Sequence, residues 1–452
     1  MSKVQSPKSK VRDFVFDFRP WALDSLMDSN AFLIVAVIAI AVLCFLLFLA
    51  LFEPGLAYKI ASPTTESLES EDFLCVLEAI TDSKIHRRGR VEVLTNGEVF
   101  YEAELEAIRA AQHSINIEAY IFQKGEVTRK LVEALTERAH AGVKVRLVID
   151  AIGSFATWES YFKELRAAGG CVCWYHPFRW YTLAHLNNRT HREIIVVDGL
   201  VAFIGGAGFA DHWYNGKGEN PRWRDTMFRI EGEPVVSLQA AFAENWLESS
   251  GEILTGRVYY PSSELENEME TLVVDSAPGA GGSTRARILF QMLLASAQKS
   301  IHITTPYFLP DRSVRRELVR AIRERNVEVK IIVPGKHSDH MLTRSSSRRL
   351  FGDLLKAGAK IYEYEKSMIH AKTLMIDGLW SVVGTTNFDN RSFGLNDEIN
   401  LAARDERLTV RIAEDFAADL AESREVSYEE WRHRSIFERA HEMLGWVLER
   451  QQ

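Results

Sequence analysis

Residues 190–199, THREIIVVDG, and residues 369–378, IHAKTLMIDG, decide the fold of this chain. Each stretch contains a histidine, a charged residue two positions later, an apolar run and then Asp-Gly. The matching positions are His191 and His370, Asp198 and Asp377, and Gly199 and Gly378, and the spacing stays identical as far as Gly205 and Gly384. The charged residue differs, because Lys372 in the second stretch corresponds to Glu193 in the first. One chain therefore carries the same pattern twice, with opposite charge at one position.

The segments around the two motifs repeat as well. From about residue 90, strand and helix signals alternate up to an apolar hairpin that contains the first motif, and the same order precedes the second motif. AAQHSINI resembles SAQKSIHI, and LRAAGGCVCWY resembles LLKAGAKIYEY. The sequence therefore predicts two similar α/β halves over residues 90–265 and 266–452, each a mixed sheet flanked by helices. A pseudo-twofold axis between such halves brings equivalent loops together, so we expect both histidines to face one cleft.

The motif residues suit chemistry on a phosphodiester. In a strand, His370 and Lys372 are two positions apart and project to the same face. A neutral imidazole can attack phosphorus, and a second, protonated imidazole can protonate the leaving alkoxide. The Lys372 ammonium offsets phosphoryl charge, and Asn387 after the next strand can donate to a phosphoryl oxygen. We expect such a site to need neither a metal nor a cofactor.

These motifs resemble those of the phospholipase D superfamily, and most closely its cardiolipin synthase-like branch. The segments that carry the resemblance are LNNRTHREIIVVDG, WRDTMFRIEG, MIHAKTLMIDG and GTTNFDNRSFGLNDEIN. The resemblance implies a phosphohistidine intermediate, with His191 as the default nucleophile and His370 as the acid and then the base. It also implies that Asp225 and Glu398 orient the histidines, and that Asp198 and Asp377 tie the motif loops in place.

Glu193 departs from the family pattern, which would place a lysine there. At ~5 Å and an effective dielectric of ~20 a charge pair is worth roughly 3 kcal/mol, so exchanging the sign could cost on the order of 6 kcal/mol. Three arrangements would reduce this electrostatic cost. Glu193 could be protonated beside the phosphate, pair with a cation such as Arg189, or serve the hydroxyl acceptor. The remaining alternative is a first half that has lost its function.

An uncharged apolar segment precedes the repeats. Residues 31–52, AFLIVAVIAIAVLCFLLFLALF, would form a helix ~33 Å long, which matches the hydrocarbon core of a bilayer. The run is too long for the apolar core of a cleaved signal peptide. Basic residues precede it, namely Lys3, Lys8, Lys10, Arg12 and Arg19, and only Lys59 follows closely. We therefore expect a cytoplasmic tail (1–30), a transmembrane helix (31–52), a connector (53–89) and an extracytoplasmic body in a bacterial plasma membrane.

The composition limits the kinds of partner and site that we expect for this protein. The net charge of −8 gives no overall attraction to nucleic acid, so we expect none as a partner. Four cysteines, Cys44, Cys75, Cys171 and Cys173, fit packing better than a disulfide framework or a zinc site. The segment WYHPFRWYTLAHLNNR is either a packed loop or a rim that guides anionic lipid head groups. The C-terminal SIFERAHEMLGWVLERQ predicts an amphipathic helix docked on the body.

Two classes of function follow. The first is a membrane-anchored phosphatidyltransferase that makes cardiolipin from phosphatidylglycerol, with a hydrolytic phospholipase D as its near neighbour. The second is a catalytically weakened phospholipid-binding or scaffold protein, because of Glu193. A phosphodiesterase nuclease is a third alternative, which the anchor and the net charge disfavour. The acceptor, the oligomeric state and the host do not follow from the motifs.

Overall fold

The computed structural model describes most of the chain, namely residues 29–52, 58–60, 66–179, 187–216, 221–277, 284–435, 438–439 and 442. It divides into two compact units, residues 1–56 and residues 57–452. Both histidine motifs belong to the second unit, so their geometry is that of one compact body.

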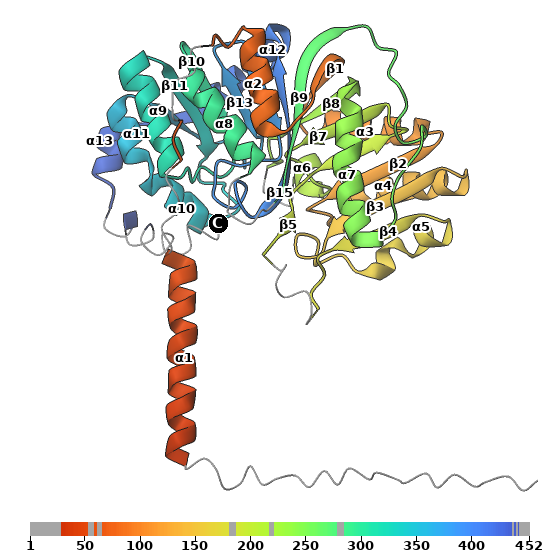
Figure 1. The fold of residues 1–452 in the computed structure, drawn as a ribbon, viewed down its shortest axis with the longest axis horizontal. Helices are drawn as coiled ribbons and strands as arrows, with labels where there is room; N and C mark the ends of the chain where they lie inside the picture. The colour runs from red at the N-terminus through yellow and green to blue at the C-terminus, as the bar shows by residue number, and fades with distance from the viewer. Residues whose placement is uncertain are drawn as a thin grey trace, which may run out of the picture. The chain divides into compact units, whose positions relative to one another are not determined.

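The first unit contains helix α1, which extends over Ser29–Phe52 (Figure 1). Its described side chains, at residues 32–45, are almost all exposed apolar groups. Within the part of the chain that the structure describes, no helix combines the length and apolarity needed to cross a membrane. The transmembrane helix expected at residues 31–52 therefore stays a prediction, and the basic tail before it lies outside the described residues.

The second unit is built on a mixed β-sheet. The strands of its first half are β1 (Ile85–Thr95), β2 (Ser114–Ala119), β3 (Lys144–Asp150), β4 (Cys171–Tyr175), β5 (Arg189–Thr190), β6 (Ile194–Val197), β7 (Val201–Gly205) and β8 (Thr226–Gly232). Those of its second half are β9 (Glu268–Ser276), β10 (Ser300–Thr304), β11 (Glu328–Pro334), β12 (Lys360–Tyr364), β13 (Thr373–Ile376), β14 (Trp380–Gly384), β15 (Asn396–Arg404) and β16 (Ser423–Val426).

Helices connect these strands and cover the sheet. In the first half they are α2 (Glu71–Thr81), α3 (Gly97–Ala110), α4 (Glu126–His140), the 3₁₀ helix η2 (Glu159–Phe162), α5 (Lys163–Ala167), α6 (Asp211–Tyr214) and α7 (Pro234–Ser250). In the second half they are α8 (Arg285–Ser296), α9 (Arg312–Arg325), α10 (Met341–Arg349), α11 (Phe351–Ala357), α12 (Glu406–Ala421) and α13 (Tyr428–Arg432).

The strand order is the same on both sides of the β9–β1 pair. Outward from β1 the order is β1-β8-β7-β6-β2-β3-β4, and outward from β9 it is β9-β15-β14-β13-β10-β11-β12, with β16 added at that edge. In each half three parallel strands are joined through helices, and the motif hairpin runs antiparallel to the first of them. Figure 1 shows the two halves side by side. The predicted α/β class with two similar halves is confirmed.

Strand β1 joins the two halves. Residues 89–95 pair with β8, whereas Ile85, His86 and Arg88 pair with β9, and the register shifts between His86 and Arg88. Such a bulge bends the strand and increases its twist, so one strand can belong to both halves. The prediction placed the first half at residue 90, whereas this strand begins at Ile85.

Three large apolar cores and one small cluster, made of Val148, Tyr175, Phe242, Trp246 and Leu254, hold the body together. One lies under α3, α4 and α5, and a second lies under α2, α8, α9 and α11. The third packs helices α7 and α12 against strands of both halves, and it includes Val196, Phe228, Leu238, Met375, Ile399 and Phe416. Each fully buried Leu, Ile or Phe contributes about 1.5–3 kcal/mol, so separating the halves would expose a costly surface.

Helix α2 lies in the range predicted as a polar connector, residues 53–89. Ser70 caps it by accepting a hydrogen bond from the Phe73 amide at 3.1 Å. Its residues Phe73, Leu74 and Leu77 are fully buried in the core of the second half. The second half of the predicted connector is therefore part of the packed body.

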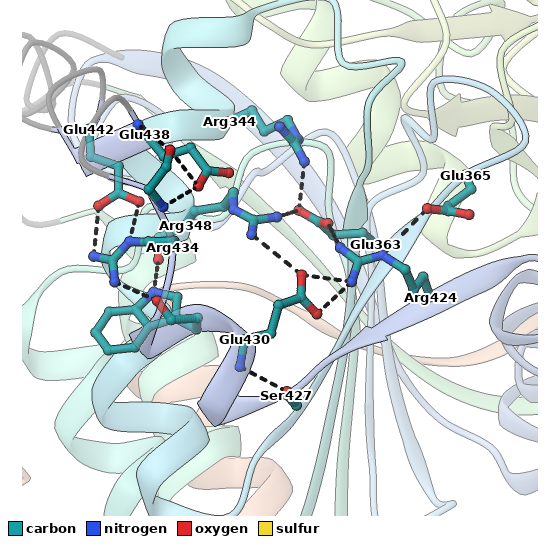
Figure 2. Close-up of polar contacts among 12 residues, drawn as sticks. Arg344, Arg348, Glu363, Glu365, Arg424, Ser427, Glu430, Arg434, Glu438 and Glu442 are labelled. Carbon is teal, nitrogen blue, oxygen red and sulfur yellow. Dashed lines mark hydrogen bonds and ion pairs between the residues drawn. The ribbon is translucent and has the colours of Figure 1, made fainter.

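An ion-pair network fastens the C-terminal segment to α10 and β12. Figure 2 shows Arg344, Arg348 and Arg424 directed at the buried Glu363 carboxylate, with Glu430 beside them. The Trp431 indole N–H donates to the carbonyl oxygen of Arg348 at 2.6 Å. The apolar residues of the predicted terminal helix, Ile436, Phe437, Ala440, Met443, Leu444 and Val447, lie outside the described residues. The network holds α10, whose N-terminal end reaches the pocket described next.

Candidate active site

The Asp-Gly turns fix both motif hairpins in the same way. Asp198 and Asp377 have φ angles of +53° and +56°, and the following glycines have +67° and +73°. Positive φ at both central residues is the hallmark of a type I′ hairpin turn, which favours Asp-Gly. The Asp198 carboxylate accepts three backbone N–H groups of residues 112–114 at 2.7–2.8 Å. Asp377 accepts those of residues 298–300, each at 2.8 Å. Both aspartates therefore tie the hairpin to the start of the neighbouring strand, and neither lines the pocket.

Asp377→Ala is expected to lower the free energy of unfolding by roughly 2–4 kcal/mol, because three charge-assisted hydrogen bonds are lost and alanine disfavours the positive φ. The measurement is urea unfolding followed by tryptophan fluorescence. Asp353→Ala is the matched control, since that carboxylate is 80% exposed on α11. Stability within about 0.5 kcal/mol of wild type would contradict the assigned role of Asp377.

Each motif histidine is paired with a carboxylate from the opposite half. Nδ1 of His191 lies 3.1 Å from Oε2 of Glu398, and Nδ1 of His370 lies 3.1 Å from Oδ2 of Asp225. Both carboxylates are fully buried. Trp213 donates its indole N–H to the Asp225 carboxylate at 3.0 Å, and the Thr385 hydroxyl donates to Glu398. These supports fix the ring orientation through Nδ1. Nε2 of His370 lies 3.3 Å from Nζ of Lys372.

The backbone enforces this crosswise pairing. Strand β5, immediately before His191, runs parallel to the start of β15, and the His191 amide donates to the carbonyl oxygen of Asp397 at 2.9 Å. The equivalent arrangement holds His370. The backbones of Arg224 and Ile369 form an isolated parallel β-bridge, and the His370 amide donates to the carbonyl oxygen of Arg224 at 2.7 Å. Neither half alone contains a complete histidine–carboxylate pair.

The motif histidines lie just outside the strands that were expected to carry them. Strand β6 begins at Ile194 and β13 at Thr373, so the preceding residues form extended segments at the strand ends. Lys372 nevertheless lies against His370, with Nζ 3.0 Å from Nδ1 and donating to the His370 carbonyl oxygen at 2.9 Å. His370 lines the pocket described below, and Lys372 is held against His370 without being among the lining residues.

One pocket of about 310 Å³ brings the two motifs together. Its lining includes His191, Glu193, His370 and Asn387, together with Tyr120, Trp223, Tyr307, Asp339, His340, Asp389 and Arg391. Aromatic rings surround the histidines: Tyr120 lies 5.2 Å from the His191 ring, and Trp213 and Trp223 lie 5.5 and 5.6 Å from the His370 ring. The expected shared cleft with one histidine from each half is present in this geometry.

Burial controls the protonation of the second motif. It lowers the pKa of His370, the nearby Lys372 charge lowers it further, and Asp225 acts in the opposite direction. Burial also lowers the pKa of Lys372 to about 8, partly offset by Asp225 and Glu398. At neutral pH Lys372 is therefore mostly charged and His370 is mostly neutral in the empty pocket. A bound phosphodiester adds negative charge, which favours protonation of His370.

Glu193 and Arg189 do not pair as one of the sequence-based alternatives required. Arg189 is buried and directs its guanidinium to the carbonyl oxygens of His176 and Asn188, with Asp150 at 3.6 Å. It does not line the pocket, so the structure does not place it as a phosphate ligand. Glu193 lines the pocket, and its Oε1 accepts the backbone N–H groups of Tyr120 at 3.1 Å and Ile121 at 3.3 Å.

Asn387 lies where the sequence predicted it. It is buried and lines the pocket, and its Oδ1 has no hydrogen-bond partner among the described residues. Asp389, two residues later, accepts the Ser392 amide at 2.7 Å, and burial raises the pKa of Asp389 to about 6. Asp389, Tyr120, Trp223, Tyr307 and Asp339 were not identified from the sequence. The available signal was position, since Tyr120 follows β2 directly and Tyr307 follows β10 closely.

Comparison with known proteins agrees with this geometry. The family described as cardiolipin synthase, PLD-like domain, matches residues 105–244 and 290–420, so each matched segment contains one histidine motif. Cardiolipin synthase 1 of Bacillus cereus is 35% identical over 361 residues, covering 78% of this chain and 70% of that protein. The cardiolipin synthase of Geobacillus thermodenitrificans is 36% identical over 360 residues, covering 79% of this chain and 71% of that protein.

Solved structures share the fold at low sequence identity. The crystal structure of phosphatidylserine synthase from Haemophilus influenzae superposes with a TM-score of 0.64 at 15% identity, covering 84% of this chain and all of that chain. Polyphosphate kinase from Porphyromonas gingivalis gives a TM-score of 0.50 at 12% identity, covering 82% of this chain and 53% of that chain. The family match and the curated relatives, together with the paired histidine motifs, show that this chain belongs to the cardiolipin synthase family of phospholipase D-like phosphatidyltransferases.

Proposed function

We propose that the protein is a cardiolipin synthase that transfers a phosphatidyl group from one phosphatidylglycerol molecule to another. The observation that carries this proposal is the pair of opposed histidine–carboxylate dyads in one pocket, His191 with Glu398 and His370 with Asp225. One dyad can attack phosphorus while the other manages the proton of the leaving and entering hydroxyl groups. The relatives named cardiolipin synthase support phosphatidylglycerol as donor and acceptor.

The transfer proceeds in two displacements. Nε2 of His191 attacks phosphorus, the bond from phosphorus to the head-group glycerol oxygen breaks, and protonated His370 gives its proton to that oxygen. Glycerol leaves, and a phosphatidyl-histidine remains. His370, now neutral, takes the proton of a hydroxyl group on a second phosphatidylglycerol, whose oxygen attacks phosphorus as the bond to His191 breaks. Lys372 and Asn387 bind phosphoryl oxygens in both steps.

Exposed apolar side chains on the body, some of them in segments that contact the pocket wall, support a lipid substrate. Phe155, Trp158 and Phe178 are 81%, 71% and 76% exposed, and they are the only exposed Phe or Trp side chains among the described residues of the body. The loop with Phe155 contacts the pocket wall, because the Ser154 hydroxyl donates to the carbonyl oxygen of Tyr120 at 2.8 Å. On the opposite half, exposed Met341 follows His340, which lines the pocket. Such a rim fits insertion into the interfacial region of a bilayer.

The anchor and its topology are part of the proposal. The uncharged sequence of residues 31–52 and the basic residues before it support a single membrane span with a cytoplasmic N-terminus. Residues 53–452 would then lie outside the cytoplasm of a bacterial cell. An extracytoplasmic body suits a substrate that resides in the membrane itself.

Protease added to intact spheroplasts is therefore expected to degrade the catalytic body and to leave a short N-terminal fragment. A cytoplasmic marker protein that stays intact in the same sample controls for lysis. Immunoblots against tags at each end of the chain provide the measurement. Full protection of the C-terminal tag would contradict the proposed orientation.

Glu193 favours a second candidate, a phospholipid-binding protein with weakened catalysis, because this residue takes the place of a cation near the phosphate. The other alternative is hydrolysis, in which water replaces the second phosphatidylglycerol as the acceptor.

A lipid assay distinguishes these functions. Purified full-length protein is incubated with phosphatidylglycerol in detergent micelles, and the lipids are analysed by mass spectrometry beside a His370→Ala control. Cardiolipin and glycerol are expected; phosphatidic acid would indicate a hydrolase, and unchanged lipid would indicate a binding protein.

A further inference from the structure

The two halves differ at two equivalent positions of the pocket. Glu193 corresponds to Lys372, each two residues after its histidine. Gly208 corresponds to Asn387, because each lies three residues beyond the glycine that ends the motif hairpin. Both polar groups that the second half offers to a phosphate are therefore replaced together in the first half. The joint replacement indicates an altered subsite rather than a single lost lysine.

Glu193 and Gly208 fit each other in space. A Cβ atom at Gly208 would lie 2.6 Å from the carbonyl oxygen of Ile121 and 2.8 Å from Oε1 of Glu193, so a side chain there would require both the Ile121 backbone and the Glu193 carboxyl group to shift. The absence of a side chain at Gly208 therefore makes the space that the Glu193 carboxyl group occupies. A side chain such as that of Asn387 is sterically incompatible with Glu193 in this position.

The Glu193 carboxyl group has one satisfied and one free oxygen. Oε1 accepts two backbone N–H groups, whereas Oε2 is buried and has no hydrogen-bond partner among the described residues. The side chain is only 6% exposed, and it lines the same pocket as the two catalytic histidines. A buried polar atom without a partner is costly unless a ligand satisfies it. Oε2 is therefore the atom of this pocket-lining residue that has a hydrogen bond still to make.

We propose that Glu193 acts as a neutral carboxylic acid whose Oε2–H donates a hydrogen bond to a non-bridging phosphoryl oxygen of the lipid, in a space that Gly208 keeps open. The first half thus supplies an uncharged donor where the second half supplies the Lys372 ammonium. This assignment rests on the proposed phosphatidyl transfer. With Lys372 and Asn387, it gives the phosphoryl group one cationic and two neutral contacts, and it keeps an ionised carboxylate away from the phosphate.

The surroundings favour the neutral form. Burial raises the pKa of Glu193 well above its usual range, and Glu104 acts in the same direction. The amides of Ile121 and Tyr120 and the Lys372 charge lower that pKa in part. The other titratable groups that line the pocket are His191, His370, Tyr120, Tyr307, Asp339, His340, Asp389 and Arg391. Because the acid must stay protonated, its contribution is present at low pH and is lost as pH rises through its folded-state pKa.

Glu193→Gln is the decisive variant, because its amide can keep the acceptor at Oε1 and a donor in place of Oε2–H without any charge. Full-length protein in phosphatidylglycerol micelles should keep kcat/KM within about threefold of wild type at neutral pH for Glu193→Gln, and lose at least about tenfold for Glu193→Ala and Glu193→Lys. Gly208→Ala should also lower kcat/KM by at least about tenfold, because the added Cβ displaces the carboxyl group. Glu106→Gln, at an exposed position of α3, is the matched control.

The pH profile separates a substrate contact from a structural role. His370 and Lys372 also lose protons as pH rises, so kcat/KM should fall at alkaline pH in both proteins, with one deprotonation more, and therefore a steeper limb, in wild type than in Glu193→Gln. A purely structural role would change thermal stability but leave the two limbs equally steep. If Glu193→Gln does not fold, the infrared band of a protonated carboxylic acid in wild type should shift when phosphatidylglycerol is added. Three outcomes would each overturn the inference. The first is active wild type with an inactive but folded Glu193→Gln, the second is a large gain of kcat/KM in Glu193→Lys, and the third is no shift of the infrared band. Wild type without any transfer would instead overturn the proposed function.

Discussion

His370→Ala is expected to reduce phosphatidyl transfer by roughly 10³-fold or more while leaving the fold intact. His370 is the general acid and then the base of the proposed reaction, and it is held by Asp225 at 3.1 Å beside Lys372. Loss of one member of a catalytic unit typically costs about as much as loss of the whole unit. The measurement is cardiolipin formation from radiolabelled phosphatidylglycerol, with circular dichroism as the test of folding.

His191→Ala should lose transfer to a similar extent, for a different reason. In the proposed reaction His191 carries the covalent intermediate, so acid-quenched wild type should contain label on a peptide with His191, and the variant should contain none. Replacement of His113 serves as the matched control, because this histidine is exposed and directly precedes β2. Turnover within about threefold of wild type in either active-site variant would remove that histidine from the mechanism.

Asp225→Asn is expected to lower kcat by roughly 10²–10⁴-fold, because an amide cannot stabilise the protonated His370 ring as a carboxylate does. Asp225 also accepts the Trp213 indole N–H and the Thr226 amide, and asparagine retains one of its two acceptor oxygens. Glu398→Gln should act in the same way on His191. Asp353→Asn, exposed on α11, is the control for the substitution itself.

The pH profile shows whether Asp225 acts through His370. Asp225 raises the pKa of His370, so removing its charge lowers that pKa further. Less of the acid form is then present at a given pH, and the limb of kcat/KM that requires protonated His370 should move to lower pH. An unchanged limb with reduced kcat would mean that Asp225 supports the fold rather than the proton transfer.

The sequence by itself determined the duplication, the α/β class and the two histidines. These are local properties: apolar strands, helix periodicity and the Asp-Gly turns at Asp198 and Asp377 follow from residues near one another in the chain. The spacing from His191 to Gly205 and from His370 to Gly384 is maintained by the hairpin itself, so it is visible without a structure.

Helix α2 and the first residues of strand β1, which pair with the second half, escaped sequence reasoning for a related reason; the rest of β1, from residue 90, was predicted as a strand. Phe73, Leu74 and Leu77 form a short apolar cluster that has meaning only when the second half offers a surface to cover. Strand β1 belongs to both halves because of a register shift between His86 and Arg88, and a period-two pattern does not reveal such a shift. Both features are set by contacts between segments far apart in the chain.

Only the tertiary structure shows which carboxylate pairs with which histidine in the site. Sequence identified Asp225 and Glu398 as supports, but only the pairing of β5 with β15 and of Arg224 with Ile369 assigns each carboxylate to the histidine of the other half. Arg189 and Glu193 lie four residues apart in sequence, yet one is directed to Asp150 and the other to the pocket. The protonation of Glu193 depends on burial, two backbone amides and the space at Gly208. Electrostatic energy depends on distance and on exclusion of water, and neither is encoded in a local stretch of sequence.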